Sequence, residues 1–128
     1  MEEIIIKKDQ DSSSKSVELV SDYLENYKYD KVLSYLKDIH NADIADILQN
    51  LDPVLRLSLL NIIDRDFDPE ILTYLNDSVR EEIIETLDIK QLANNAKSLD
   101  IDDAVDLAED LEEKDKTIFL ENLVLDPE

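Results

Sequence analysis

The sequence contains no glycine and no cysteine among its 128 residues. Without glycine it has no glycine-rich phosphate loop and no dinucleotide-binding fingerprint, and we expect no turn that relies on glycine at positive φ. Tight β-hairpins, whose favoured turns use glycine or asparagine, are also disfavoured. Without cysteine there is no disulfide framework, no thiolate metal site and no cysteine nucleophile, which fits a reducing compartment.

Long apolar runs and an excess of positive charge are missing as well. No run approaches the ~20 apolar residues needed to span a bilayer, and the start, "MEEIIIKKDQ", lacks the basic and apolar regions of a signal peptide. The formal net charge of −20 opposes binding to nucleic acid or to anionic lipid. The sequence therefore predicts a soluble, cytoplasmic module whose partners are cations or basic proteins.

Helical spacing of apolar residues dominates the rest of the chain. From Val17 onward apolar residues recur every three to four positions, which predicts an all-α fold. Residues 1–16 include the polar stretch "KKDQDSSSKS" and are expected to form a flexible tail. We predict about nine short helices, at about 17–27, 30–39, 42–51, 54–64, 69–76, 79–88, 90–98, 102–111 and 114–125.

Helix-start signals recur along the sequence. Asp52-Pro53 and Asp68-Pro69 each place an Asp at the cap position before a Pro at the first helical position. Ser78 and Glu81 match the Ser-x-x-Glu capping box. The sequence then stops at "LDPE", where Asp126-Pro127 repeats the first signal. We therefore expect the native protein to continue into a further helix.

The sequence also contains a weak internal repeat. "DIADILQNL" (43–51) aligns with "DAVDLAEDL" (103–111), so that Asp46 matches Asp106 and Leu51 matches Leu111. Short helices with such self-similarity are typical of a superhelix in which each helix contacts its neighbours. A compact helical bundle is the alternative that the composition leaves open.

The most acidic stretch is "DIDDAVDLAEDLEE" (100–113), with eight acids among fourteen residues and no base. Like charges at helical spacing repel, and a hard divalent cation such as Mg²⁺, which prefers carboxylate oxygens, would relieve that repulsion. The alternative is a solvated acidic face that only aids solubility. The predicted apolar stripe of this helix consists of Ile101, Ala104, Val105, Ala108 and Leu111, and the acidic face consists of Asp102, Asp106 and then Glu109 or Asp110.

The sequence gives little support for catalysis. Its single histidine, His40, stands before an expected helix start, where a capping or surface role is expected, and no second histidine exists to build a triad or a zinc site. Glu70 follows Pro69 in the first turn of a helix, where the helix dipole favours a carboxylate. We predict that the protein is not an enzyme, with no catalytic and no cofactor-binding residues.

The chain resembles the cytoplasmic N-terminal domain of the MgtE magnesium transporters over residues 30–128. Three segments carry the resemblance in order: "LKDIHNADIADILQNLDPVLRLSLLNII", "DPEILTYLNDSVREEIIETL" and "SLDIDDAVDLAEDLEE". His40-Asn41 departs from the His-Pro pair common in that family. The resemblance implies a right-handed superhelix of short helices over residues 17–128, similar to armadillo and FliG modules. It also implies that a CBS pair and a transmembrane channel follow, in a homodimer whose N-terminal domain lies at the cytoplasmic side of the membrane.

The resemblance further implies a regulatory mechanism. In that family Mg²⁺ bridges acidic residues of this domain to the CBS domains of the same full-length chain, and the pore closes at high Mg²⁺. Carried over residue by residue, the candidate ligands for this weak, regulatory Mg²⁺ site are Asp102 and Asp106, followed by Asp103 and Glu70. The sequence holds no CBS or membrane segment, so any ion site in it is half a site. The alternative function is a FliG-like helical scaffold, whose acidic face contacts a basic protein without sensing an ion.

Overall fold

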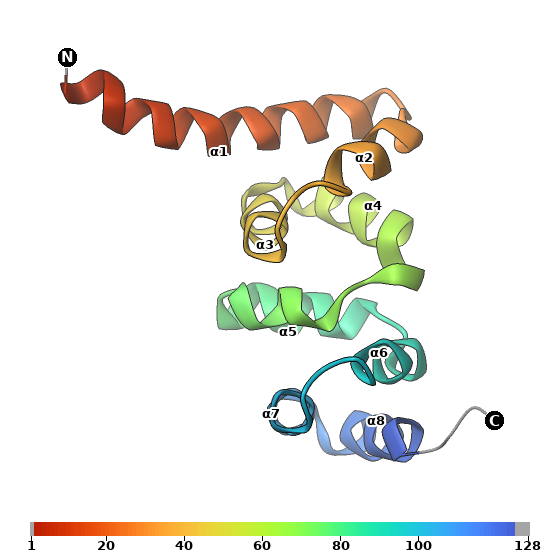
Figure 1. The fold of residues 1–128 in the computed structure, drawn as a ribbon. Coiled ribbons are helices and arrows are strands. Elements are labelled where there is room, and N and C mark those ends of the chain that lie inside the picture. The colour runs from red at the N-terminus through yellow and green to blue at the C-terminus, as the bar shows by residue number, and fades with distance from the viewer. Residues whose placement is uncertain (1, 125–128) are drawn as a thin grey trace. The chain divides into compact units, whose positions relative to one another are not determined.

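The regular secondary structure of this chain is helical. The structure, a computed structural model, describes the backbone of residues 2–124 and the side chains of residues 14–124. No strand occurs in this described part, so the all-α prediction is confirmed. From the second helix on, the predicted boundaries lie within three residues of the observed ones. Figure 1 shows the elements in chain order: α1 (Glu2–Glu25), α2 (Tyr29–Leu36), α3 (Asn41–Asn50), α4 (Pro53–Ile63), the 3₁₀ helices η1 (Asp64–Asp66) and η2 (Pro69–Tyr74), α5 (Asp77–Thr86), α6 (Ile89–Ala96), α7 (Ile101–Glu109) and α8 (Glu113–Val124).

The first helix is longer than predicted. α1 begins at Glu2, so the segment expected to form a flexible tail is helical up to the predicted helix start near Val17. The segment contains neither proline nor glycine, and its Glu, Lys and Gln residues favour a helix once a nucleus has formed downstream. The flexibility of this segment stays a prediction, and the Asp126-Pro127 signal lies outside the described residues.

The chain divides into two compact units, Met1–Ile62 and Ile63–Glu128. In the first unit α1 packs against α2 and α3. In the second unit α8 packs against α6 and α7, and η2 packs against α6. The side chain of Asn95 on α6 donates hydrogen bonds to the carbonyl oxygens of Arg65 (3.1 Å) and Phe67 (3.0 Å), and thereby fixes the segment that leads into η2. Each unit thus has its own core and its own internal contacts.

The weak sequence repeat extends through both units. α2, α3 and α4 begin at Tyr29, Asn41 and Pro53, and α6, α7 and α8 begin sixty residues later in each case, at Ile89, Ile101 and Glu113. Burial keeps the same offset: the buried Val32, Leu36, Ile44, Ile47, Leu48, Leu51 and Leu59 are matched by the buried Leu92, Ala96, Ala104, Leu107, Ala108, Leu111 and Phe119. We call α1–α4 the first repeat and α5–α8 the second repeat. Residues sixty apart in α2–α4 and α6–α8 can therefore be compared as equivalent positions.

Helix caps follow the predicted signals at two of the three predicted starts. The Asp52 carboxylate accepts the N–H of Val54 at 3.1 Å, and the Asp68 carboxylate accepts the N–H of Glu70 at 3.0 Å. Asp88 caps α6 in the same way through the N–H of Lys90, at 3.0 Å. His40 occupies the cap position of α3, but its side chain makes no cap hydrogen bond.

The predicted capping box at Ser78 is wrong. α5 begins at Asp77, and its cap is Asn76, whose side-chain oxygen accepts the N–H of Val79 at 2.9 Å. Ser78 lies inside the first turn. Asn caps a helix as well as Ser does, and this earlier start also places the Asp77 carboxylate in the first turn, where the helix dipole favours it.

One turn departs from what the lack of glycine predicted. Tyr27, just after α1, has a positive φ of 58°. The N–H of Lys28 donates to the carbonyl of Tyr23 at 2.8 Å, and the N–H of Tyr27 donates to the carbonyl of Leu24 at 3.2 Å. This is the Schellman pattern of helix termination, which usually places glycine at the left-handed position. A chain without glycine forms the turn with tyrosine instead.

Candidate functional site

The candidate site is built on α7, the helix of the most acidic stretch. Asp100 occupies its cap position, and Asp102 and Asp103 lie in its first turn. Carboxylates are favoured there because unpaired N–H groups give a helix N-terminus partial positive charge. Ala104, Leu107 and Ala108 are buried and anchor the helix in the second unit. The acidic residues are thus held on a helix whose opposite face is fixed by packing.

The apolar stripe predicted for α7 is partly wrong. Ile101 is 76% exposed and Val105 is 47% exposed, whereas Leu107, which the prediction omitted, is only 6% exposed. Two stripes overlap in this sequence, and the residues at 104, 107, 108 and 111 follow helical spacing as well as the predicted set does. In the structure it is this second stripe that is buried. The exposed side of α7 therefore carries two aliphatic side chains among its acids.

Three carboxylates of α7 line one pocket of about 270 Å³ in the second unit. Asp103, Asp106 and Asp110 contribute from α7 and its C-terminal end, at i, i+3 and i+7. Arg80 of α5 lines the same pocket, and its Nε lies 3.8 Å from Oδ2 of Asp110. The remaining lining residues are Leu72, Thr73 and Leu107. The pocket thus combines a triad of acids with one guanidinium.

The four predicted ligands are only partly brought together. Asp103 and Asp106 share the pocket, whereas Asp102 and Glu70 are not among its described lining residues. Asp102 is exposed on α7, and Glu70 is exposed in η2, where its N–H bonds to the Asp68 side chain. The sequence analysis did not predict Arg80. Its place in the site depends on how α5 lies against the C-terminal end of α7, which no local sequence pattern indicates.

The donor chemistry of this face fits Mg²⁺ in part. Mg²⁺ keeps several water ligands and is usually bound through one or two carboxylates rather than an all-protein cage. Among the side chains that the structure describes, those of residues 14–124, no group of three or more His, Asp or Glu is arranged to hold a metal ion. The face therefore offers carboxylates of the right kind but not a complete set, as half a site would.

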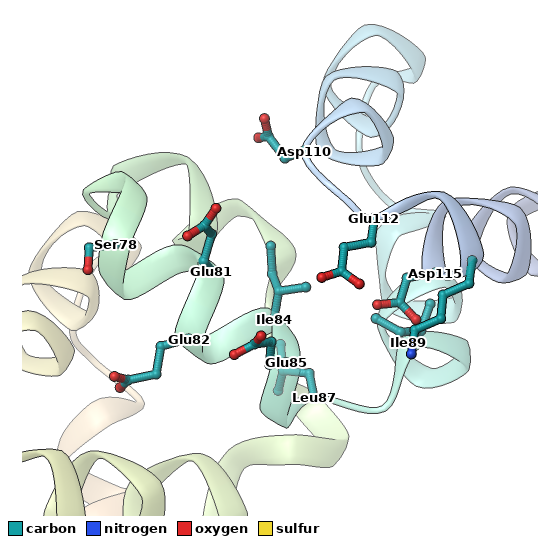
Figure 2. A pocket seen from close by; sticks show the side chains of 11 residues that line it. Ser78, Glu81, Glu82, Ile84, Glu85, Leu87, Ile89, Asp110, Glu112 and Asp115 are labelled. Atoms are coloured by element: carbon teal, nitrogen blue, oxygen red, sulfur yellow. The ribbon is translucent and has the colours of Figure 1, made fainter.

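A second acidic concavity lies beside α5 and has a volume of about 600 Å³. Glu81, Glu82 and Glu85 line it from α5, and Ile84, Leu87 and Ile89 supply apolar surface. Figure 2 shows the carboxylates of Glu112 and Asp115 across the pocket from α5. Asp110 lines this concavity as well as the smaller pocket. The sequence analysis did not predict this concavity, because its acids come from α5 and from the distant segment around the junction of α7 and α8.

The described part of the chain is thus an acidic, all-helical domain with a carboxylate-lined pocket on α7. In a comparison with protein families, residues 39–128 match the family described as the MgtE intracellular N domain. The chain therefore belongs to this family, the N-terminal domain of magnesium transporters, which is a regulatory domain and not an enzyme family. Comparisons with curated proteins and with solved structures gave no match.

The matched region begins just before α3 and runs to the end of the sequence. It therefore includes all of the second repeat, with α7 and its acids, but leaves out α1 and α2. None of the helices in the described part of the chain is long and apolar enough to cross a bilayer. The resemblance inferred from the quoted segments is confirmed at the level of the family.

Proposed function

We propose that this chain is the Mg²⁺-sensing regulatory domain of a magnesium transporter. The proposal is supported by family membership and by one geometric observation, the shared pocket of Asp103, Asp106 and Asp110 on α7. Asp102 extends this acidic face in the first turn, and Glu70 adds a carboxylate on η2. In the full-length protein we expect these residues to meet acidic residues of the CBS domains.

The chain's own residues supply the sensing through their charge. The acids of α7 repel one another and repel any acidic surface brought against them. When bound, Mg²⁺ offsets this negative charge and allows the two acidic faces to meet. A cation that binds the joined state better than the separated state shifts the population toward the joined state. We propose that this joined state is the one in which the pore is closed.

The proposal has consequences for the whole protein. The full-length chain contains CBS domains and membrane-spanning segments beyond this domain, forms a homodimer, and holds this domain at the cytoplasmic side of the membrane. The partners of α7 are then the CBS domains, and neither nucleic acid nor lipid contacts it. The strong negative charge of the chain favours this set of partners.

The test is a Mg²⁺ titration of isotope-labelled protein followed by NMR. We expect weak, fast-exchanging shifts centred on Asp102, Asp103 and Asp106, because half a site binds weakly. The first repeat provides an internal control, since Asp43 and Asp46 hold the equivalent positions on α3. Shifts of equal size on α3 and α7 would contradict specific sensing by α7. Calcium and magnesium chloride series would then establish the ion preference.

A second candidate is a FliG-like scaffold that contacts a basic protein. It is favoured by the exposure of Ile101 and Val105 on the same helix as the acids, because interface cores combine apolar side chains with a polar rim. In this case the double variant Asp102→Asn and Asp106→Asn weakens binding to the partner equally with and without Mg²⁺. A loss of binding that appears only with Mg²⁺ present would favour the sensing function.

A further inference from the structure

Arg80 connects two helices of the second unit. It lies on α5, and its side chain is 21% exposed. Its guanidinium donates a hydrogen bond to Oδ1 of Asp77, one turn earlier on the same helix. Its Nε lies 3.8 Å from Oδ2 of Asp110, at the C-terminal end of α7. A half-buried positive charge is therefore held close to the acidic helix.

Arg80 is also the basic residue in the pocket that contains two of the four candidate ligands, Asp103 and Asp106. Among the described residues lining that pocket, Asp103, Asp106 and Asp110 are acidic and Arg80 alone is basic. Arginine stays protonated under all ordinary conditions, so its charge is permanent. The guanidinium thus offsets part of the negative charge in the pocket before any ion arrives.

The first repeat shows what the position of Asp110 looks like without a charge. Asn50 is the residue equivalent to Asp110, and it donates a hydrogen bond to the carbonyl of Asp46 at 2.8 Å. The first repeat therefore has a neutral amide at this position. In the second repeat the position carries a carboxylate, and that carboxylate lies beside the Arg80 guanidinium.

We infer that Arg80 is a built-in counter-ion of the α7 acidic face and sets the concentration at which that face binds Mg²⁺. The inference rests on the proposed Mg²⁺-sensing function. A fixed positive charge beside the pocket lowers the attraction of its carboxylates for a divalent cation, because the two positive charges repel each other. It also keeps the acidic face from repelling itself when Mg²⁺ is scarce. Arg80 is thus a residue that tunes the site and not a ligand.

The experiment compares Mg²⁺ affinity in the wild type and three variants by NMR titration. Arg80→Gln removes the charge, Arg80→Lys keeps it, and Arg65→Gln is a control that changes the net charge equally at an exposed residue of η1 outside the pocket. We expect Arg80→Gln to bind Mg²⁺ about threefold to tenfold more tightly, because one nearby charge acts through a high-dielectric surface. Arg80→Lys and Arg65→Gln should stay within about twofold of the wild type.

The wild type supplies a readout that depends on no variant. The Nε resonance of Arg80 should move during the titration as Mg²⁺ competes for the pocket carboxylates. If Arg80→Gln binds no more tightly than Arg65→Gln, or the Arg80 resonance stays still while α7 shifts, Arg80 does not tune the site and the inference is overturned. The proposed function then still stands. If no resonance of α7 responds to Mg²⁺ in any protein, the proposed function fails and the inference fails with it.

Discussion

The Nε of Arg56 donates a hydrogen bond of 2.7 Å to the carbonyl oxygen of Leu48, and so α4 closes the C-terminal end of α3. The same guanidinium lies 3.3 Å from the Gln49 carbonyl and 3.4 Å from the Leu51 carbonyl. The last carbonyls of a helix have no partner within it and carry partial negative charge. Arg56 is only 7% exposed, so its buried charge is balanced by these backbone oxygens.

We predict that Arg56→Met lowers the free energy of unfolding by about 2–4 kcal/mol, because it leaves buried carbonyls without their donor. Urea denaturation followed by circular dichroism measures the loss. Lys116 is the equivalent residue of the second repeat, and it pairs at 3.3 Å with the Glu109 side chain, which is mostly exposed. Lys116→Met should therefore cost less than about 1 kcal/mol. Equal losses in the two variants would show that Arg56 does not act as a buried cap.

The sequence predicts a large part of this fold but not the role of Arg56. Apolar spacing and the Asp caps at Asp52 and Asp68 depend on residues close together along the chain, so local physics finds those helices. The burial of an arginine depends instead on where the end of another helix lies. In the sequence Arg56 lies within the apolar segment "PVLRLSLLNII", and nothing in that segment distinguishes it from an exposed arginine.

The cap of α5 gives a second stability test. Asn76→Ala removes the oxygen that accepts the N–H of Val79, and we expect it to cost about 1 kcal/mol. Ser78→Ala should change the free energy of unfolding by less than about 0.5 kcal/mol, because Ser78 is an exposed residue inside the first turn. Chemical denaturation of both variants measures the difference. A larger loss from Ser78→Ala would restore the capping box predicted from the sequence.

The candidate site was harder to predict than the fold. Helical spacing predicts Asp106 on the acidic face, and the family resemblance implies Asp103; these two residues share a pocket. Asp102 lies outside that pocket. The buried face of α7 includes Leu107, so the helix is rotated about its axis relative to the predicted orientation. Two apolar stripes of similar quality overlap in α7, and its packing against other elements, α8 among them, decides which stripe is buried. The involvement of Arg80 is likewise a matter of packing between helices distant in sequence.

The orientation of α7 can be tested by a pair of substitutions. Leu107→Ala should lower the free energy of unfolding by about 2–4 kcal/mol, because it opens a cavity at a buried position. Val105→Ser should change it by less than about 1 kcal/mol, because Val105 is about half exposed. Thermal and urea unfolding of both variants give the comparison. A large loss from Val105→Ser with little loss from Leu107→Ala would support the stripe predicted from the sequence.

The net charge of −20 predicts that the stability of the folded chain depends on salt concentration. Exposed carboxylates repel one another over the Debye length, which shrinks from about 30 Å at 0.01 M salt to about 3 Å at 1 M. Raising the KCl concentration over this range should therefore stabilise the folded chain and raise the midpoint of thermal unfolding by about 3–6 °C. Replacing KCl by NaCl should give the same curve, since screening does not distinguish the two salts.

A MgCl₂ series at matched ionic strength should raise the midpoint of thermal unfolding further, because an ion that binds the folded state adds to its stability. If the MgCl₂ and KCl curves coincide, screening accounts for the whole effect and the folded chain does not bind Mg²⁺ measurably.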